Sequence, residues 1–377
     1  MKRYDRISLS EFTRTVWVFG AGASVVEPYK VPTQYRLLSH FANMTRPGPD
    51  QYQKNLDALR QSVRAHCKAV QPGLQMEDPR LSLEEVFSAY ELAILEKRSS
   101  PDAARQAERA LADLREALRL ATQVYGPGTL KKWMPHGRGT VRSPYAELLE
   151  RLVPLTSGSE IRHVLVTMNY DINLDRCIIN LRKARPDHDL DYGISLSNYR
   201  FEESAPEFEP PRGGSSTLLL RLHGALNWIR CWACHSIFTT VNKHAYVTET
   251  DKCWACGRNR LDYILVHPSF LRRYDDPILQ IVWGRFQEEL VRADRWVFVG
   301  YSLPAPDVHF RELMRDCIRV RKERGMATEV LMVGLGPTDR EDWKNTVASY
   351  SAVCVDNLAV WNATSGGFSD FVQCIEA

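Results

Sequence analysis

Four cysteines near the middle of the chain have the spacing of a metal site. They form a C-x2-C-x18-C-x2-C array, and each pair encloses a Trp-Ala dipeptide. Each pair places two thiolates on one tight turn, and two such turns supply the ligands of a closed tetrahedral zinc site. We therefore predict that one structural zinc ion is bound by Cys231, Cys234, Cys253 and Cys256. Four buried thiols or a redox pair are the alternative.

A glycine-rich segment after an early apolar run could bind phosphate. The run Thr15–Phe19 leads directly into Gly20-Ala21-Gly22-Ala23-Ser24. Glycines let backbone N–H groups approach a pyrophosphate, and the N-terminus of a following helix adds partial positive charge. The usual dinucleotide fingerprint is incomplete, because Val25 replaces its third glycine and no acidic residue lies near position 40 to hold a ribose. A tight turn without a ligand is the alternative.

Asn169 and Asp171 follow the apolar run Val164–Val166. Alternate positions at the carboxyl end of a parallel strand point into the crevice where such folds bind ligands. An Asx turn or a helix N-cap explains the same residues equally well. His223, in Leu222-His223-Gly224, also ends an apolar run and could accept a proton from a hydroxyl near neutral pH. A structural His-Gly turn is its alternative.

Two further loops repeat this arrangement. The run Val297–Val299 leads into Gly300-Tyr301-Ser302, and Val330–Val333 leads into Gly334. Each loop would bring backbone amides to the same edge of a sheet, and the first would add a small hydroxyl group. These positions are therefore further candidates for ligand contacts.

The elements that must position these residues alternate between short apolar runs and helical patterns, which predicts a parallel sheet covered by helices. A helix should begin near Pro32, with Leu37, Leu38 and Phe41 on its inner face. The Pro- and Gly-containing stretch 203–216 is predicted to be a flexible surface loop. The predicted strands are 15–19, 164–166, 217–221, 263–266, 296–299 and 330–333.

Residues 45–145 differ from the rest because they are rich in charged and helix-forming residues. Ser100 is a good N-cap, Pro101 suits the first helical position, and Gly126 would end the helix. Its apolar stripe comprises Leu111, Leu114, Leu118, Ala121 and Tyr125. This region is predicted to be a helical insertion packed on the sheet.

Bulk composition excludes several classes of protein. A chain of 377 residues with 44% hydrophobic residues can bury a large core, and a net charge of +3 alone does not favour a nucleic-acid partner. No apolar run approaches the roughly 20 residues of a membrane span, and the N-terminus lacks the apolar segment of a secretory signal. The basic run Arg319–Arg324 is interpreted as a solvated helix face. We expect a soluble, cytoplasmic protein whose nine cysteines form no disulfide framework.

Taken in order, GAGAS, TMNYD, LHG, the paired cysteines and GYSLP resemble the succession of motifs in the sirtuin family, from about residue 15 to residue 340 apart from the insertion. The T-x-NYD motif and the spacing His223–Trp228 are most similar to sirtuin-like proteins of bacterial antiphage defence, which are NAD+ hydrolases. The resemblance implies an α/β fold: a Rossmann-like parallel sheet with helices on both faces, a helical insertion and a small zinc-ribbon module with four cysteine ligands.

The resemblance also implies domain bounds and residue roles. Residues 1–44 and 146–377 would form the NAD-binding domain, 45–145 the insertion and 226–262 the zinc ribbon. Asn169 would position the water or the ribose, Asp171 would hold the nicotinamide carboxamide, and His223 would be the general base on a ribose hydroxyl. The other cofactor-binding candidates are Gly20, Ala21, Gly22 and Ser24 at the pyrophosphate, Pro32 and Thr33 at the nicotinamide ribose, and Gly300, Tyr301, Ser302 and Gly334.

Two departures from the family bear on the reaction. The Phe-Gly-Glu strand that pairs with acyl-lysine peptides in deacylating sirtuins is replaced by Ile264–Phe270, and Met168 replaces the usual glutamine. We therefore expect NAD+ hydrolysis to nicotinamide and ADP-ribose, with an NAD-dependent deacylase or a non-catalytic NAD or ADP-ribose sensor as alternatives. The resemblance further implies control by homo-oligomerisation or by a regulatory partner such as a HerA-type ATPase, and no membrane or nucleic-acid partner.

Overall fold

The chain contains two compact units. Unit 1 comprises residues 1–30, 125–265 and 275–377, and unit 2 comprises 31–124 and 266–274. The division into 1–44 with 146–377, 45–145 and 226–262 stays a prediction. The computed structural model describes residues 2–3, 6–9, 11–25, 31–44, 50–96, 101–122, 143–156, 162–184, 188–198, 215–240, 247, 251–334, 341–354, 358–362 and 367–376.

An eight-stranded parallel sheet forms the centre of unit 1, in the order β1-β13-β12-β11-β3-β4-β7-β5. Its central strands are almost continuous apolar runs, as expected for a sheet buried on both faces. In sheet order the strands are β1 (Lys2–Arg3), β13 (Leu358–Asn362), β12 (Glu329–Gly334), β11 (Arg295–Val299), β3 (Arg14–Phe19), β4 (Arg162–Thr167), β7 (Ser215–Arg221) and β5 (His188–Asp191).

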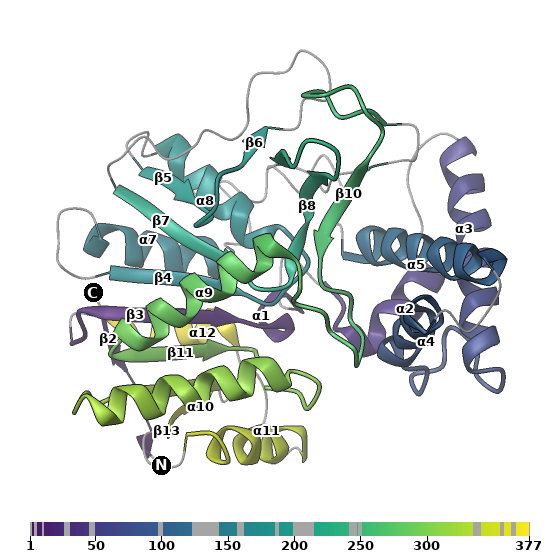
Figure 1. Ribbon diagram of the computed structural model, residues 1–377. Helices are drawn as coiled ribbons and strands as arrows, with labels where there is room; N and C mark the ends of the chain where they lie inside the picture. Colours follow the sequence, from purple (N-terminus) through teal and green to yellow (C-terminus); the bar gives the residue numbers. More distant parts are fainter. Residues whose placement is uncertain are drawn as a thin grey trace. The chain divides into compact units, whose positions relative to one another are not determined.

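Helices cover both faces of this sheet (Figure 1). On one face Phe19 packs edge-on against Tyr145 of α7 and also contacts Phe368 of α12. Phe298 is in register with Val18 and so points the other way, towards Phe310 of α10 and Tyr350 of α11. The helices are α7 (Pro144–Thr156), α8 (Asn173–Ala184) and α12 (Phe368–Gln373) on the first face, and α9 (Pro277–Arg292), α10 (Val308–Glu323) and α11 (Glu341–Ser351) on the second.

The order of the strands reverses between β3 and β11. From β3 the chain builds the sheet outward through β4 and β7, and it later returns to β11 and builds outward in the opposite direction through β12 and β13. Parallel α/β sheets bind ligands at such a reversal, outside the carboxyl ends of the strands. The last residues of β11, β3, β4 and β7 are in register, so the loops that follow them begin side by side.

A second, four-stranded sheet carries the cysteine pairs. Its order is β10-β8-β9-β6, and β8 is antiparallel to both β10 and β9. The strands are β10 (Leu261–Leu265), β8 (Gly224–Cys231), β9 (Ile237–Thr239) and β6 (Ser197–Asn198). The prediction of a parallel sheet strand at 263–266 was therefore wrong, because β10 leads out of the second cysteine pair and hydrogen-bonds to β8. A short sheet pairs β14 (Ile375–Glu376) with β2 (Ile7–Ser8).

Unit 2 is helical. It contains α2 (Gln34–Asn43), α3 (Asp50–Val70), α4 (Leu83–Leu95) and α5 (Pro101–Thr122). The inner face expected for the helix after Pro32 is buried, and so are Leu111, Leu114, Leu118 and Ala121 of α5. Ser100, Tyr125, Gly126 and the predicted loop 203–214 lie outside the described residues, whereas Ser215 and Ser216 begin β7. None of the helices in the described ranges has the length and apolar character needed to cross a membrane.

The returning segment 266–274 is held on α4 within unit 2. The Glu91 carboxylate lies 2.7 Å from Nδ1 of His267 and accepts a hydrogen bond of 2.6 Å from the Ser269 hydroxyl. The amide of Phe270 donates to the Ser88 hydroxyl at 2.8 Å. Unit 2 is therefore discontinuous in sequence, and its core includes residues from two distant parts of the chain.

Candidate active site and metal centre

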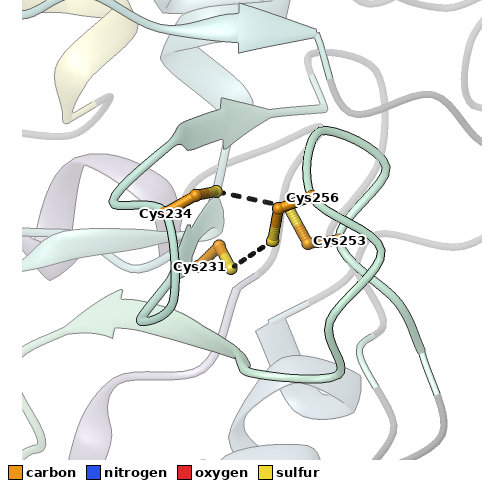
Figure 2. A group of neighbouring side chains, drawn as sticks. All are labelled: Cys231, Cys234, Cys253 and Cys256. Atoms are coloured by element: carbon orange, nitrogen blue, oxygen red, sulfur yellow. Dashed lines mark hydrogen bonds between the residues drawn. The ribbon is translucent and has the colours of Figure 1, made fainter.

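The four predicted cysteine ligands converge from two loops (Figure 2). The sulfurs of Cys231 and Cys256 are 3.7 Å apart, as are those of Cys234 and Cys253, and all four lie within 4.8 Å of one another. Four sulfurs at a Zn–S distance of about 2.3 Å in a tetrahedron are separated by about 3.8 Å. The donor set therefore fits a zinc ion with no open coordination position, as the spacing of the cysteines predicts.

Both cysteine pairs have the same backbone conformation. In each pair the residue after the second cysteine, His235 or Gly257, has a left-handed φ of +60° or +72°. Its amide donates to the carbonyl of the first cysteine, at 2.8 Å in one pair and 2.6 Å in the other. These turns aim two sulfurs at one point. The Ser236 hydroxyl and amide hydrogen-bond to Cys234 and lower the pKa of its thiol to about 6, which favours the thiolate that a metal needs.

The remaining candidates of unit 1 lie at the carboxyl edge of the parallel sheet, on loops that follow neighbouring strands. Gly300 follows β11, Gly20 follows β3, Asn169 follows β4 and His223 follows β7. The register of the sheet therefore brings together residues separated by up to 280 positions in the chain, here Gly20 and Gly300. Gly334 ends β12, the strand beyond β11.

The glycines in two of these loops are needed because the loops contact each other. The amide of Gly22 donates to the carbonyl of Gly300 at 2.9 Å. A Cβ on Gly20 would lie 2.6 Å from that carbonyl oxygen, and a Cβ on Gly22 would lie 2.9 Å from it. Gly300 has φ +61°, and its own Cβ would lie 2.4 Å from the amide nitrogen of Ala23. Gly22 and Ala23 lie in the first turn of helix α1 (Ala21–Val25), so the contact is made at the start of this helix.

A buried polar network joins the glycine-rich loop to the loop after β4. Both amide hydrogens of Asn169 are donated within the protein, to the Gly20 carbonyl at 2.9 Å and to the Ser24 hydroxyl at 3.1 Å. Ser24 also lies 3.1 Å from the phenol oxygen of Tyr145, on α7. Asn169, Ser24 and Tyr145 are all buried. The side chain of Asn169 is thus held in one orientation, with its carbonyl oxygen as the group that remains to act as an acceptor.

Asp171 is buried in the same network. One of its carboxylate oxygens accepts from the amide of Asn173 at 3.0 Å, which forms the Asx turn that starts α8. Burial raises the pKa of Asp171, against the lowering effects of that amide, of the Arg221 charge and of the Ser24 hydroxyl. Asn173 is also buried, and its Nδ2 has no hydrogen-bond partner among the described residues.

His223 is buried at the turn between β7 and β8, and its ring stacks on Tyr170 with centroids 6.0 Å apart. Gly224 follows with φ +70°, and a Cβ there would lie 2.0 Å from the Ile264 carbonyl of β10. The Leu222 carbonyl accepts from the Trp283 indole at 2.9 Å. Both neighbours of His223 are therefore fixed, one by a hydrogen bond and the other by a close approach that only glycine permits.

Tyr301, Ser302, Pro32 and Thr33 are placed as follows. The Tyr301 ring is buried, with its phenol donating to Asp307 and its backbone carbonyl accepting from the Tyr350 phenol at 2.9 Å. Ser302 is exposed at the same edge. Pro32 and Thr33 belong to unit 2, immediately before α2, where the Thr33 carbonyl accepts from the amide of Arg36. The cofactor-binding roles of these residues stay predictions.

Sequence reasoning missed several residues of this edge. Tyr145, Tyr170 and Arg221 each contact a candidate residue or the backbone that carries it, and Asp175 is the ion-pair partner of Arg221. Arg221 could have been found, because an arginine that directly follows three leucines in a predicted buried strand requires a buried partner. The partners of Tyr145 lie more than 20 positions away, and no local pattern indicates them.

No family model matches this chain, and no curated protein is similar to it. The solved structures that match it include Sir2 homologues. A Sir2 homologue in a complex with NAD is 16% identical over 97% of this chain and 88% of that one, with a TM-score of 0.42. A Sir2 protein bound to an acetylated peptide is 15% identical over 97% and 92%, with a TM-score of 0.39.

Proposed function

We propose that this protein is an NAD+ hydrolase with a sirtuin-like site at the carboxyl edge of its parallel sheet. One observation carries the proposal: adjacent strands β4 and β7 deliver Asn169, Asp171 and His223 to the edge where the glycine-rich loop after β3 also ends. This is the reversal point at which such sheets bind nucleotides. The order of motifs that resembles the sirtuin family supports NAD+ as the substrate.

The proposed binding mode uses groups that the fold has left available. The Asn169 carbonyl oxygen would accept from a water or a ribose hydroxyl, because both of its amide hydrogens are donated internally. Asp171 would hold the carboxamide of nicotinamide. The Nδ2 of Asn173, which has no hydrogen-bond partner within the described part of the chain, would supply a further buried donor two residues away. Exposed Ser302 and the backbone around Gly300 would contact the adenosine side, with the pyrophosphate near Gly20–Ser24.

In the proposed reaction the bond between nicotinamide nitrogen and the ribose anomeric carbon breaks, and its electron pair leaves with nicotinamide. The ribose passes through an oxocarbenium-like state, which a rigid site with little bulk water stabilises by position and charge. Asn169 aims one water at the anomeric carbon. His223, as general base, accepts a hydrogen bond from a ribose hydroxyl and polarises its O–H bond. NAD+ and water give nicotinamide, ADP-ribose and a proton.

The test is nicotinamide release by purified protein, followed by mass spectrometry with and without an acylated peptide. Wild-type protein should release nicotinamide without peptide, and His223→Ala should lose at least about 100-fold of the rate. His163→Gln is the matched control, because His163 is a buried histidine at the amino end of β4. The proposal fails if wild-type protein releases none, or if His223→Ala matches the wild type.

Deacylation is the second candidate, favoured by the presence of the four-cysteine centre. It predicts that NAD+ consumption depends on the acylated peptide and yields an acyl-ADP-ribose. Tight binding of ADP-ribose or NAD+ without turnover would instead indicate a sensor. The three hypotheses therefore differ in products that one time course separates.

The biological setting belongs to the same proposal. Unchecked NAD+ hydrolysis would kill a host cell, so we propose a cytoplasmic protein of antiphage defence that is held inactive until infection. Control would come from assembly into a homo-oligomer or from a separate partner such as a HerA-type ATPase. Measuring the NAD+ content of infected cells that express wild-type or His223→Ala protein tests this role, and light scattering of the purified chain tests the assembly.

A further inference from the structure

The side chain of Arg221 is completely buried at the end of β7 and contacts both loops of the proposed site. Its guanidinium donates to the Asn169 carbonyl at 2.9 Å and to the Asp171 carbonyl at 2.7 Å. Its Nε lies 3.4 Å from the carbonyl of Gly224, the residue after His223. One side chain therefore joins the backbone of the loop after β4 to the turn after β7.

The Asn169 and Asp171 carbonyls lie beyond the end of β4, where the parallel sheet supplies no donor for them. A buried carbonyl without a donor is destabilising, so a donor group must be provided at each one. The guanidinium has five N–H donors in one plane with a fixed geometry. It can therefore satisfy several acceptors at once and fix their relative positions, which a flexible ammonium group cannot do equally well.

The charge of Arg221 is balanced by Asp175, whose side chain is also completely buried. Asp175 accepts in turn from the phenol of Tyr192 at 2.5 Å. Tyr192 hydrogen-bonds to Asn227 of β8, and Asn227 donates to the carbonyl of Thr240 at 3.0 Å. The Arg221–Asp175 pair, which we call the clamp, is thus connected by hydrogen bonds to the sheet that carries the predicted zinc ligands. The guanidinium is held from both sides.

We propose that Arg221 is a positioning residue for NAD+ cleavage: it sets the distance between the Asn169–Asp171 loop and the His223 turn. This inference rests on the proposed function of the site. Stability alone is a weak explanation for the pair, because exchanging a buried ion pair for uncharged residues is often neutral or stabilising. Fixing two reacting loops in one geometry is a role that an apolar replacement cannot take over, since the loop carbonyls would lose their donors.

The experiment compares three variants with wild-type protein. Arg221→Met with Asp175→Asn removes both charges while keeping an acceptor for Tyr192. Arg221→Lys keeps the charge but has only three N–H donors for four acceptors. The matched control is Arg295→Met with Glu329→Gln, which removes an ion pair of 2.6 Å between buried Arg295, at the amino end of β11, and half-buried Glu329. For each we would measure the unfolding midpoint, zinc content, kcat and KM for NAD+, and the NMR titration of the His223 ring.

We expect the Arg221/Asp175 variant to keep its zinc and fold but to lose about 10- to 100-fold in kcat, as misplacement of reacting groups does. Its KM should change less than kcat, and Arg221→Lys should fall between it and the wild type. The Arg295/Glu329 control should change the unfolding midpoint without changing kcat. Wild-type kcat in either Arg221 variant would overturn the proposal, and the lysine variant decides the matter if the double variant does not fold.

The His223 titration separates this inference from the proposed function. If wild-type protein releases no nicotinamide, the proposed function has failed and the NMR signal alone tests the clamp. A clamp that positions His223 predicts a shifted or broadened His223 ring resonance in both Arg221 variants and an unchanged one in the Arg295/Glu329 control. A His223 resonance and pKa equal to wild type in both variants would rule it out.

Discussion

Asp171 has a carboxyl group whose ionised form is disfavoured by burial. The pKa is raised because burial outweighs the Asn173 amide, the Arg221 charge and the Ser24 hydroxyl. The folded protein therefore holds this proton more tightly than the unfolded chain does. The contribution of Asp171 to folding stability is fully present below the ordinary pKa of an aspartate, and it is lost as the pH rises through the raised pKa of the folded protein.

Asp171→Asn should consequently stabilise the fold and reduce the reaction. The amide keeps an acceptor for Asn173 but carries no charge, so unfolding at pH 8 should require on the order of 1 kcal/mol more than in wild type. The difference in free energy of unfolding between the Asn variant and wild type should shrink as the pH falls towards about 4. Nicotinamide release by the variant should be slower than by wild type at all pH values. Denaturant titrations at several pH values measure the difference, and a gain that is independent of pH would contradict the assignment.

Gly300 offers a second residue-level test because its conformation and its surroundings both exclude a side chain. Gly300→Ala adds left-handed strain of about 1–2 kcal/mol and a clash with the Ala23 amide, so we expect a loss of more than about 2 kcal/mol together with weaker nucleotide binding. Gly325→Ala is the control, since its φ is +69° but nothing lies within 4 Å of the added Cβ. Calorimetry with ADP-ribose should separate them; equal affinities would contradict the role of the Gly22–Gly300 contact.

At this scale the sequence predicts what is local. The four cysteines are identified by spacing alone. Each of the two turns that orient their sulfurs spans only six residues, 231–236 and 253–258. Arg221 and Asp175 are 46 positions apart, and Ser24 and Tyr145 are 121 apart. Their contacts exist only once the sheet has aligned β3, β4 and β7, so no spacing rule indicates them.

At the scale of elements, an apolar run predicts a strand but not its partner. The runs that became β3, β4, β7, β11 and β12 were found because parallel strands are buried on both faces. The run at 263–266 has the same composition, yet β10 pairs with β8 in the other sheet. The difference is that β8 leads into the first cysteine pair and β10 leads out of the second, and the two pairs converge.

Zinc removal tests the link between the four-cysteine centre and the reaction. Strand β8 begins at Gly224 and ends at Cys231, so loosening the ligands should loosen the turn that carries His223. We expect about one zinc per chain, and chelation or Cys231→Ser should reduce nicotinamide release at least about 10-fold with a lower unfolding midpoint. Cys317→Ser, which alters a buried cysteine outside the cluster, should keep the metal. Full activity of the zinc-free protein would show that the centre does not support the site.

At the scale of the whole molecule, the two compact units have separate cores. Leu114 is buried in α5 of unit 2, and Leu331 is buried in β12 of unit 1. Each exchange to alanine should cost about 2–5 kcal/mol. Since multi-domain chains depart from two-state unfolding, we expect two calorimetric transitions, one lowered by Leu114→Ala and the other by Leu331→Ala. A single transition shifted equally by both would show that the units unfold together.

The contact between Gly22 and Gly300 has a consequence for protein synthesis. Strand β3 emerges from the ribosome near the start of translation, but its neighbour β11 and the loop at Gly300 follow only when 300 of 377 residues have been made. Until then one edge of β3 has no partner, and the Gly300 side of the proposed site does not exist. If the proposed function holds, a nascent or truncated chain cannot cleave NAD+, and activity begins only when the sheet is complete.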